Sequence, residues 1–244
     1  MKSDLHTVSV VNDIFKYADD TTLLAPEHTD VELDIEFQQV KDWAAINCLK
    51  LNLIKTKELV FKRPRVQYFH LPPALEAIEQ LDCCKLLCVI FQSNLKMDSH
   101  VQFILSQCAQ RMYVLKLLRH QGMPDTQLSI VTTALIISRV QYALSAWGGF
   151  LSSELENKID AFFRLLRRFG YIDYTLKVAD LICKSDHDLF CKMCLPGHSL
   201  HHLMPPPRIC DHLRERGHPF QLPDFSTELH RKSCVVRCLY QFRK

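Results

Sequence analysis

The stretch that decides the fold is Phe15-Lys16-Tyr17-Ala18-Asp19-Asp20-Thr21-Thr22-Leu23-Leu24. β-Branched and aromatic residues stand on both sides of the acidic pair, a pattern that predicts two short strands joined by a tight turn. A turn can direct both carboxylates to one side, and hard carboxylate oxygens suit magnesium, which can act in pairs in phosphoryl transfer. On the dipeptide alone, the simpler interpretation is that two Asp residues make the turn, since Asp is a favoured turn residue.

Outward from this hairpin, the sequence predicts a strand-containing first third and a helical remainder, which is an α+β fold class. A helix is expected from Thr29 or Asp30, as N-cap, to about Asn47. Further strands are expected at 59–61 and 86–91. Apolar residues at helical spacing predict helices over 99–122, from 124–125 onward and from 152–153 to 170, with shorter ones at 175–183 and 186–194. The expected domains are a sheet-containing part at 1–95, a helical region at 96–170, and a tail at 171–244 with short helices, a Pro-rich break and basic residues.

The glycine content, net charge and cysteine count argue against several classes of function. Only 6 of 244 residues are glycine, which argues against a Gly-rich phosphate cradle, and the net charge of +3 is too small to indicate nucleic-acid binding by itself. The 11 cysteines are accompanied by no signal peptide, which predicts free thiols or metal ligands instead of a disulfide framework. No uninterrupted apolar run of 18 residues occurs. We therefore expect an intracellular protein, nuclear or cytoplasmic, that is neither secreted nor membrane-bound. Its oligomeric state is not predicted.

The string from Phe15 to Leu24 resembles the catalytic hairpin in the palm of reverse transcriptases, specifically those of LINE-like non-LTR retrotransposons. The following segments arrive in that family's order: Trp43, Leu49-Lys50-Leu51-Asn52 and Lys55-Thr56-Lys57-Glu58. Residues 85–91 are similar to the primer-grip hairpin, although Cys88 stands where the family usually has glycine. A thumb-like helical region follows, and the resemblance extends from about Asp4 to Gly170 and, more weakly, to Lys244.

The resemblance implies a role for individual residues. Asp19 and Asp20 match the two palm acids that hold Mg²⁺, or Mn²⁺, while Tyr17 and Ala18 shape the hairpin beside the primer end. Lys55 matches a lysine near the nucleotide phosphates, with a solvated turn lysine as the equal alternative, and Phe91 would support the primer, with plain core as its alternative. The implied partners are an RNA template and a DNA primer, whose backbone the basic residues Arg164, Arg167 and Arg168 would contact.

Such polymerases need a third carboxylate, many tens of residues before the hairpin, together with fingers that hold the nucleotide. Only 18 residues precede Asp19, and neither Asp4 nor Asp13 matches that motif. We therefore expect a C-terminal palm and thumb fragment that is inactive by itself. The alternatives are a non-catalytic nucleic-acid-binding module built on the helical region and a relic without selected function. A truncated palm would also expose sheet edges and apolar surface.

The tail contains residue types that bind zinc. Cys191, Cys194, His198 and His202 lie close together in the sequence, but a second tight cysteine pair at finger-like spacing does not occur. Cys191 and Cys194 also fall three residues apart on an expected helix among apolar neighbours, as buried structural thiols do. No zinc site is therefore predicted here.

Overall fold

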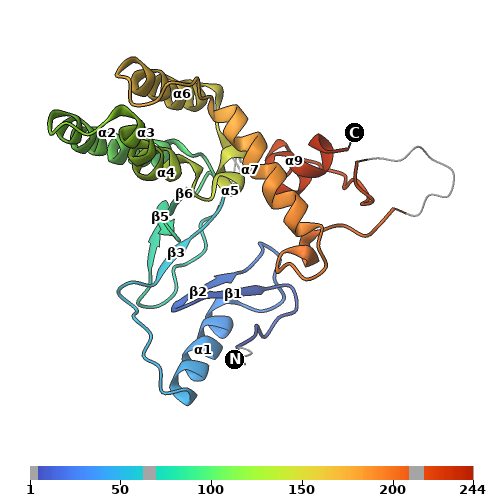
Figure 1. Cartoon of the computed structure of the whole chain (residues 1–244). Helices are drawn as coiled ribbons and strands as arrows, with labels where there is room; N and C mark the ends of the chain where they lie inside the picture. The colour runs from blue at the N-terminus through green and yellow to red at the C-terminus, as the bar shows by residue number, and fades with distance from the viewer. Residues whose placement is uncertain (1–4, 63–69, 209–216, 244) are drawn as a thin grey trace. The chain divides into compact units, whose positions relative to one another are not determined.

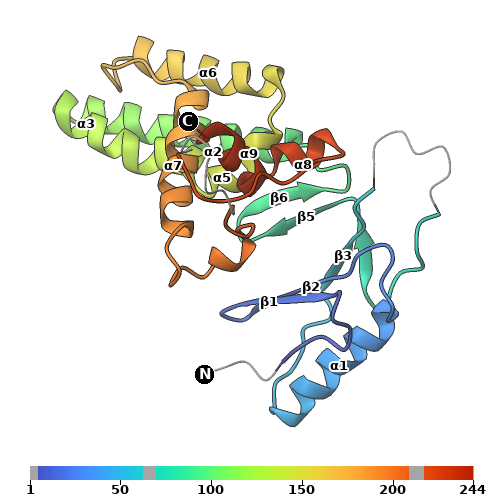
Figure 2. The same cartoon turned by 90° about the vertical axis from the view of Figure 1, so that its right-hand side faces the viewer.

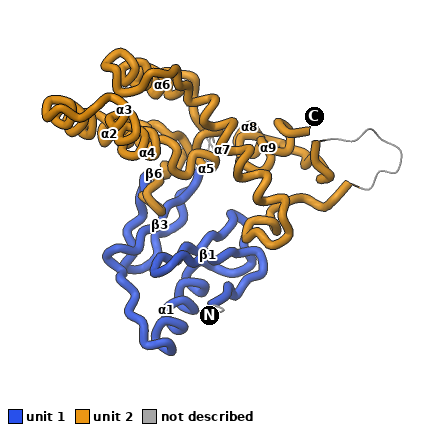
Figure 3. The backbone as a smooth tube through the Cα atoms, viewed as in Figure 1, with its two compact units in different colours: residues 1–84 blue, residues 85–244 orange. Residues whose placement is uncertain are grey.

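A computed structural model describes residues 5–62, 70–208 and 217–243 of the chain. The chain divides into two compact units, Met1–Cys84 and Lys85–Lys244 (Figure 3). Strands and helices are present in both units, so the predicted α+β class is confirmed. Asp4, Cys210 and the arginines at 214 and 216 lie outside the described residues.

Unit 1 contains the predicted hairpin and one helix. Strands β1 (Asp13–Tyr17) and β2 (Asp20–Leu24) pair antiparallel, with Tyr17 opposite Asp20. Helix α1 (Leu33–Ile46) lies against this hairpin in both views (Figures 1 and 2). Strands β3 (Lys57–Leu59) and β4 (Glu79–Leu81) form a separate parallel pair. The hairpin prediction is confirmed, whereas the strand expected at 59–61 begins two residues earlier.

Helix α1 begins later than the sequence predicts, because both expected caps are engaged elsewhere. The Thr29 hydroxyl donates to the Asn12 side-chain oxygen at 2.8 Å, and Asp30 accepts a hydrogen bond from the Ser9 hydroxyl. Glu32 occupies the N-cap position instead, without a side-chain capping bond. Tertiary hydrogen bonds have therefore displaced the local capping preference.

A second hairpin crosses the boundary between the units. Its strands are β5 (Cys83–Leu86) and β6 (Val89–Gln92), where the sequence predicts a single strand over 86–91 and, by resemblance, a hairpin. The domain boundary expected at residue 95 differs from this division, since β6 packs on helix α2 of unit 2.

The remainder of unit 2 is helical. Helix α2 (Asp98–His120) is followed by α3 (Asp125–Thr132), the π-helical turn η1 (Thr133–Ile137) and α4 (Ser138–Gln141). Then come α5 (Leu144–Trp147), the 3₁₀ turn η2 (Gly148–Phe150), α6 (Ser153–Arg168) and α7 (Val178–Met193). After the 3₁₀ turn η3 (His201–Leu203), the tail forms α8 (Glu228–Lys232) and α9 (Cys234–Gln241).

Local sequence signals explain several of these boundaries. The Ser152 hydroxyl accepts from the Leu155 N–H at 3.3 Å and caps α6. Gly122 and Gly170 follow α2 and α6 with φ of +85° and +68°, the left-handed conformation that ends helices and favours glycine. The two short helices expected at 175–183 and 186–194 are instead one continuous helix, α7, because its buried residues Val178, Leu181, Asp186 and Phe190 follow one helical stripe.

Unit 2 carries the hydrophobic core. The larger apolar cluster joins α2, α3, α5 and α6 around Trp147 and Phe163, and the smaller one joins α7 to α9 through Phe190 and Leu239. In unit 1 the described buried apolar residues are Leu5, Val40, Ala44 and Ile78, while large apolar side chains such as Val10 and Ile54 are 97% and 86% exposed. Unit 1 thus exposes large apolar side chains.

One helical stretch in the described residues, Asp125–Phe150, is long and apolar enough to cross a membrane by length and composition. Leu128, Ile136, Val140 and Trp147 from this stretch are fully buried in the core of unit 2. The stretch is also interrupted at Ala143, where φ is +52°. About 39% of its apolar window is buried inside the structure.

Candidate functional site

The β1–β2 hairpin presents its two carboxylates at the tip. Its loop has two residues, Ala18 and Asp19, and Ala18 adopts φ of +50°, the sign that two-residue hairpin loops need at their first position in a type II′ turn. Asp19 lies in the loop and Asp20 opens β2, and both side chains are exposed. Tyr17, which closes the turn opposite Asp20, is 69% exposed. The four predicted residues Tyr17, Ala18, Asp19 and Asp20 therefore stand together on one accessible turn.

Two interactions fix the hairpin within unit 1. The Lys16 ammonium lies 4.7 Å from the centroid of the Trp43 ring, which joins β1 to α1 by a cation–π contact. The buried Glu36 carboxylate of α1 accepts from the backbone N–H groups of Val8 and Ser9 at 2.9 and 2.8 Å. It also accepts from the Asn12 amide at 2.8 Å, so α1 holds the chain that leads into β1.

The electrostatics of Glu36 match this role. Burial by itself would raise the pKa of Glu36, but the hydrogen bonds from Ser9, Asn12 and Val8 outweigh it and lower the pKa below the ordinary value. Glu36 therefore stays ionised at neutral pH, and it orders the segment before β1 as a charged acceptor.

The fit of a divalent cation to the hairpin is partial. Asp19 and Asp20 supply the hard oxygen ligands that magnesium and manganese prefer. Within the described parts of the chain, however, neither belongs to a group of three potential ligand residues. Lys55 lies exposed in a turn of the same unit, where its own backbone N–H donates to Asn52. This placement matches the simpler alternative, a solvated turn lysine.

The β5–β6 hairpin has an unusual turn. Leu87 and Cys88 form its two-residue loop and adopt φ of +44° and +67°, which is the type I′ pattern that strongly prefers Asn-Gly. The Tyr142 hydroxyl donates to the Leu87 carbonyl at 3.1 Å and ties the turn to the helices. Val89 is buried and Phe91 is half-buried against the core of unit 2, whereas Leu87 at the turn is 40% exposed.

The predicted arginines lie at the C-terminal end of α6. Arg164, Arg167 and Arg168 are exposed. The Arg167 guanidinium donates to the Thr175 hydroxyl at 2.7 Å, and Arg168 lies 5.3 Å from the centroid of the Phe169 ring. Their simplest role is to complement the negative end of the helix dipole.

A fourth arginine joins this helix end to α2. Arg119, in the last turn of α2, donates to the Gly170 carbonyl at 2.8 Å and to the Phe169 carbonyl, and it stacks on Tyr171 with 4.4 Å to the ring centroid. Figure 2 shows α2 and α6 on the same side of unit 2. The two C-terminal ends thus form one basic surface, which we call the α2–α6 basic end, consisting of Arg119, Arg164, Arg167 and Arg168.

The four residues considered as zinc ligands are not brought together. Cys191 lies 3.7 Å from a ring nitrogen of His187, while the Nδ1 atom of His198 accepts from the Leu200 N–H and that of His202 faces the Ser199 carbonyl. Burial raises the pKa of Cys194, which keeps its thiol protonated. Within the described residues, this set forms no ligand cluster.

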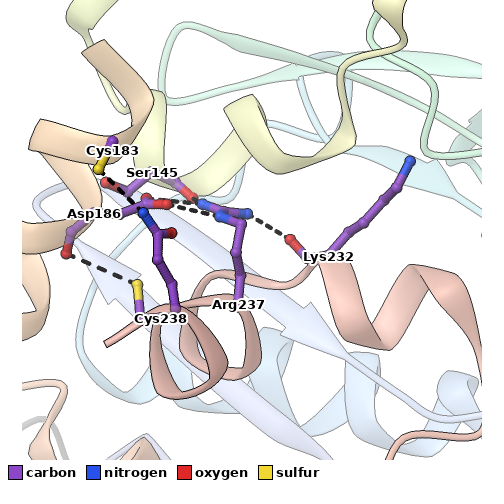
Figure 4. A network of polar contacts seen from close by, with 7 residues as sticks. Ser145, Cys183, Asp186, Lys232, Arg237 and Cys238 are labelled. Carbon is purple, nitrogen blue, oxygen red and sulfur yellow. Dashed lines mark hydrogen bonds and ion pairs between the residues drawn. The ribbon is translucent and has the colours of Figure 1, made fainter. Parts of the chain in front are cut away.

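The structure instead assembles a polar cluster that sequence reasoning missed, between α5, α7 and α9 (Figure 4). Asp186 is fully buried, and its carboxylate accepts two hydrogen bonds from Arg237, 51 residues later. Cys234 and Cys238 lie beside it. A Cys-x₃-Cys spacing and an Asp on the apolar stripe of a helix are the signals in the sequence, but neither identifies its partner.

Comparison with known proteins gives no match. No family model matches the chain, and no curated protein or solved structure is significantly similar to it.

Proposed function

We propose that the β1–β2 hairpin is part of the metal-binding palm site of a reverse transcriptase similar to those of LINE-like non-LTR retrotransposons. The observation that carries the proposal is the turn Tyr17-Ala18-Asp19-Asp20, in which a two-residue loop presents adjacent exposed carboxylates. Two divalent ions in phosphoryl transfer need such oxygen ligands, whereas the alternative, two Asp residues that only form the turn, needs no metal. Asp19 and Asp20 would hold the ions, and Tyr17 would adjoin the primer end.

The second hairpin supports the same proposal. Cys88 occupies the position where the family has glycine, and its φ of +67° is one that glycine adopts without strain. The local backbone at residue 88 thus keeps the conformation for which glycine is suited, even though the side chain has changed. Phe91 would then act beside the primer from a half-buried position on β6.

The 244-residue chain is proposed to be inactive as a polymerase by itself. Two-metal transfer requires ligands that fix both ions on the attacking and leaving oxygens. Among the described residues, Asp19 and Asp20 have no third ligand within reach. Two exposed carboxylates hold a divalent ion weakly and leave its position undetermined, so the geometric requirement of catalysis is not met.

Primer extension tests this proposal. The chain, an RNA template and a DNA primer are incubated with Mg²⁺ or Mn²⁺, beside Asp19→Ala and the matched control Asp13→Ala from the opposite end of the hairpin. We expect no product above background in any of the three. Product from the wild type and Asp13→Ala that disappears in Asp19→Ala would overturn the claim of inactivity and establish a polymerase.

A second function, nucleic-acid binding by unit 2, is favoured by the α2–α6 basic end. Arg164, Arg167 and Arg168 are exposed in the last turns of one helix, and Arg119 holds the neighbouring helix end against them. Guanidinium groups on a rigid helix end suit phosphate contacts, which position a nucleic acid without reading its sequence. This function requires neither Asp19 nor Asp20.

Filter binding of a DNA–RNA duplex across a salt series tests the second function. The triple variant Arg164→Ala, Arg167→Ala and Arg168→Ala should weaken binding and reduce the dependence of affinity on salt, since fewer counterions are released. The triple variant Lys184→Ala, Lys192→Ala and Arg243→Ala removes the same charge from exposed positions elsewhere. Equal losses in both triple variants would show a net-charge effect and contradict a defined surface.

A further inference from the structure

The Asp186 cluster has an arrangement that helix packing alone does not require. The carboxylate of Asp186 on α7 and the thiols of Cys234 and Cys238 on α9 each offer one ligand atom, and these atoms all lie within 4.8 Å of one another. Ligands around a tetrahedral zinc ion stand about 3.8 Å apart, given Zn–S bonds of about 2.3 Å. Small side-chain rotations that move the ligand atoms by about 1 Å would therefore bring all three within bonding distance of one zinc ion.

Arg237 holds the Asp186 carboxylate in a fixed orientation, in which it can bind a metal ion. Its Nε and Nη2 atoms donate to the two carboxylate oxygens at 2.7 and 2.8 Å, and Nη2 also donates to the Ser145 carbonyl at 2.9 Å (Figure 4). Each carboxylate oxygen has two lone pairs, so an oxygen that accepts from Arg237 can still bind a metal. Ligating carboxylates are ordinarily oriented by such outer hydrogen bonds.

The charges of the buried cluster balance when a zinc ion is added. Zn²⁺ and the guanidinium of Arg237 carry three positive charges, which two thiolates and the Asp186 carboxylate match. Because Asp186 and Cys238 are almost completely buried, an unbalanced charge there would be costly. Binding exchanges the two thiol protons for the metal ion, which leaves the cluster neutral both before and after.

The two thiols are also available for a metal. Both cysteines are free, and they stand four residues apart on one helix. Side chains at that spacing have Cβ atoms about 5–6 Å apart, whereas a disulfide needs about 3.5–4.5 Å. The helix therefore opposes a disulfide and leaves a dithiol. The Cys238 thiol donates to the backbone carbonyl of Asp186, which holds this sulfur next to the carboxylate-bearing residue.

We propose that Asp186, Cys234 and Cys238 form a zinc site in unit 2, with the fourth position open to water or another ligand. The bound ion would clamp α9 to α7, and it would add to the stabilisation that the Asp186–Arg237 pair supplies. Two sulfurs and one oxygen favour zinc or another thiophilic ion over magnesium, so this site is chemically distinct from the Asp19–Asp20 hairpin.

Cobalt titration tests the proposal. The chain is stripped with a chelator under reducing conditions and titrated with Co²⁺, which reports thiolate ligation by sulfur-to-metal absorption and tetrahedral geometry by intense visible bands. We expect both signals to saturate at one ion per chain and to be abolished by equimolar Zn²⁺. Zn²⁺ should also raise the melting temperature of the stripped protein.

Two variants locate the site. Cys234→Ser, at a partly exposed position, should lose most of the sulfur-to-cobalt absorption while its circular dichroism stays that of the wild type. The matched control Cys191→Ser with Cys194→Ser removes two other thiols from the same unit and should retain the signal. The proposal is overturned if the wild type shows no sulfur-to-cobalt absorption, or if the absorption survives in Cys234→Ser and disappears in the control.

Discussion

The guanidinium of Arg237 and the carboxylate of Asp186 form a two-point ion pair with bonds of 2.7 and 2.8 Å, although 51 residues separate them. Burial by itself would lower the pKa of Arg237, but the hydrogen bond and charge of Asp186 raise it above the ordinary value, so the guanidinium stays charged. Arg237 also donates to the carbonyls of Ser145 and Lys232. One side chain of the tail therefore connects α5, α7 and the end of α8.

Removal of Arg237 should destabilise unit 2 strongly. Arg237→Ala leaves the Asp186 charge buried without a partner, which costs about 3–5 kcal/mol. Urea unfolding followed by Trp147 fluorescence, in a Trp43→Phe background, measures the change. Arg231→Ala, which breaks an exposed pair with Glu228, should leave the free energy of unfolding nearly unchanged. A loss in Arg237→Ala no larger than in this control would contradict the assigned role.

Gly149 makes room for the Arg237 side chain. A Cβ atom at Gly149 would stand 1.7 Å from Arg237 Nη1 and 2.4 Å from the Lys232 carbonyl oxygen. Gly149→Ala should therefore displace the arginine and destabilise unit 2 by about 1–3 kcal/mol, as overpacking does. Gly197→Ala, whose added Cβ meets nothing within 4 Å, is the control. Identical urea midpoints for the two variants would refute the account of this contact.

Cys88→Gly should stabilise the β5–β6 hairpin. A non-glycine residue in the left-handed region costs about 1–2 kcal/mol, and glycine relieves this strain at φ of +67°. The same urea experiment should show a gain of about 1 kcal/mol, reduced by the greater freedom of glycine in the unfolded chain. Cys83→Gly in the extended strand β5 should weaken the hairpin instead. Destabilisation by Cys88→Gly would be inconsistent with the turn described.

Acidification should destabilise unit 2 through His100. Its Nδ1 accepts from the Ile90 N–H at 3.2 Å, its ring meets Trp147 edge-on at 4.8 Å, and burial lowers its pKa to about 4. Between the unfolded pKa of 6.5 and the folded pKa, the unfolded chain binds the proton more tightly, so stability falls as pH falls through this window. The loss should reach roughly 3 kcal/mol.

His100→Gln should flatten this pH dependence, whereas His202→Gln, at an exposed position, should preserve it. Urea midpoints of both variants at several pH values between 6.5 and 4 provide the comparison. If the wild type and His100→Gln lose stability in parallel over this window, another group is responsible.

The sequence predicts those turns and helix ends that depend only on neighbouring residues. The Asp19–Asp20 turn, the Ser152 cap and the Gly122 and Gly170 endings follow from residue types that act within one turn of chain. The start of α1 could not be predicted, because Thr29 and Asp30 bond to Asn12 and Ser9. A residue that would cap a helix cannot do so when its side-chain oxygen is hydrogen-bonded to a residue distant in the sequence.

Of the two candidate sites, one is formed by residues adjacent in the sequence and the other by residues that only the tertiary fold brings together. Asp19 and Asp20 are adjacent in the sequence and exposed on one turn, so the sequence alone could place them together. The Asp186 cluster depends on the packing of α9 against α7 across about fifty residues, and no local spacing specifies that contact. For the same reason, the sequence offers Cys191 and Cys194 with the nearby His198 and His202 as zinc candidates, whereas nothing local connects Cys234 and Cys238 to Asp186.

The central claim, that the Asp19–Asp20 hairpin binds the divalent ions of a palm site, is tested most directly by paramagnetic broadening in amide-proton spectra. Substoichiometric Mn²⁺ should selectively broaden the signals of Tyr17 to Thr21 in the wild type and in Asp13→Ala. Asp19→Ala should lose this broadening while its other signals stay in place. Equal broadening in Asp19→Ala, or none at the hairpin of the wild type, would contradict the claim.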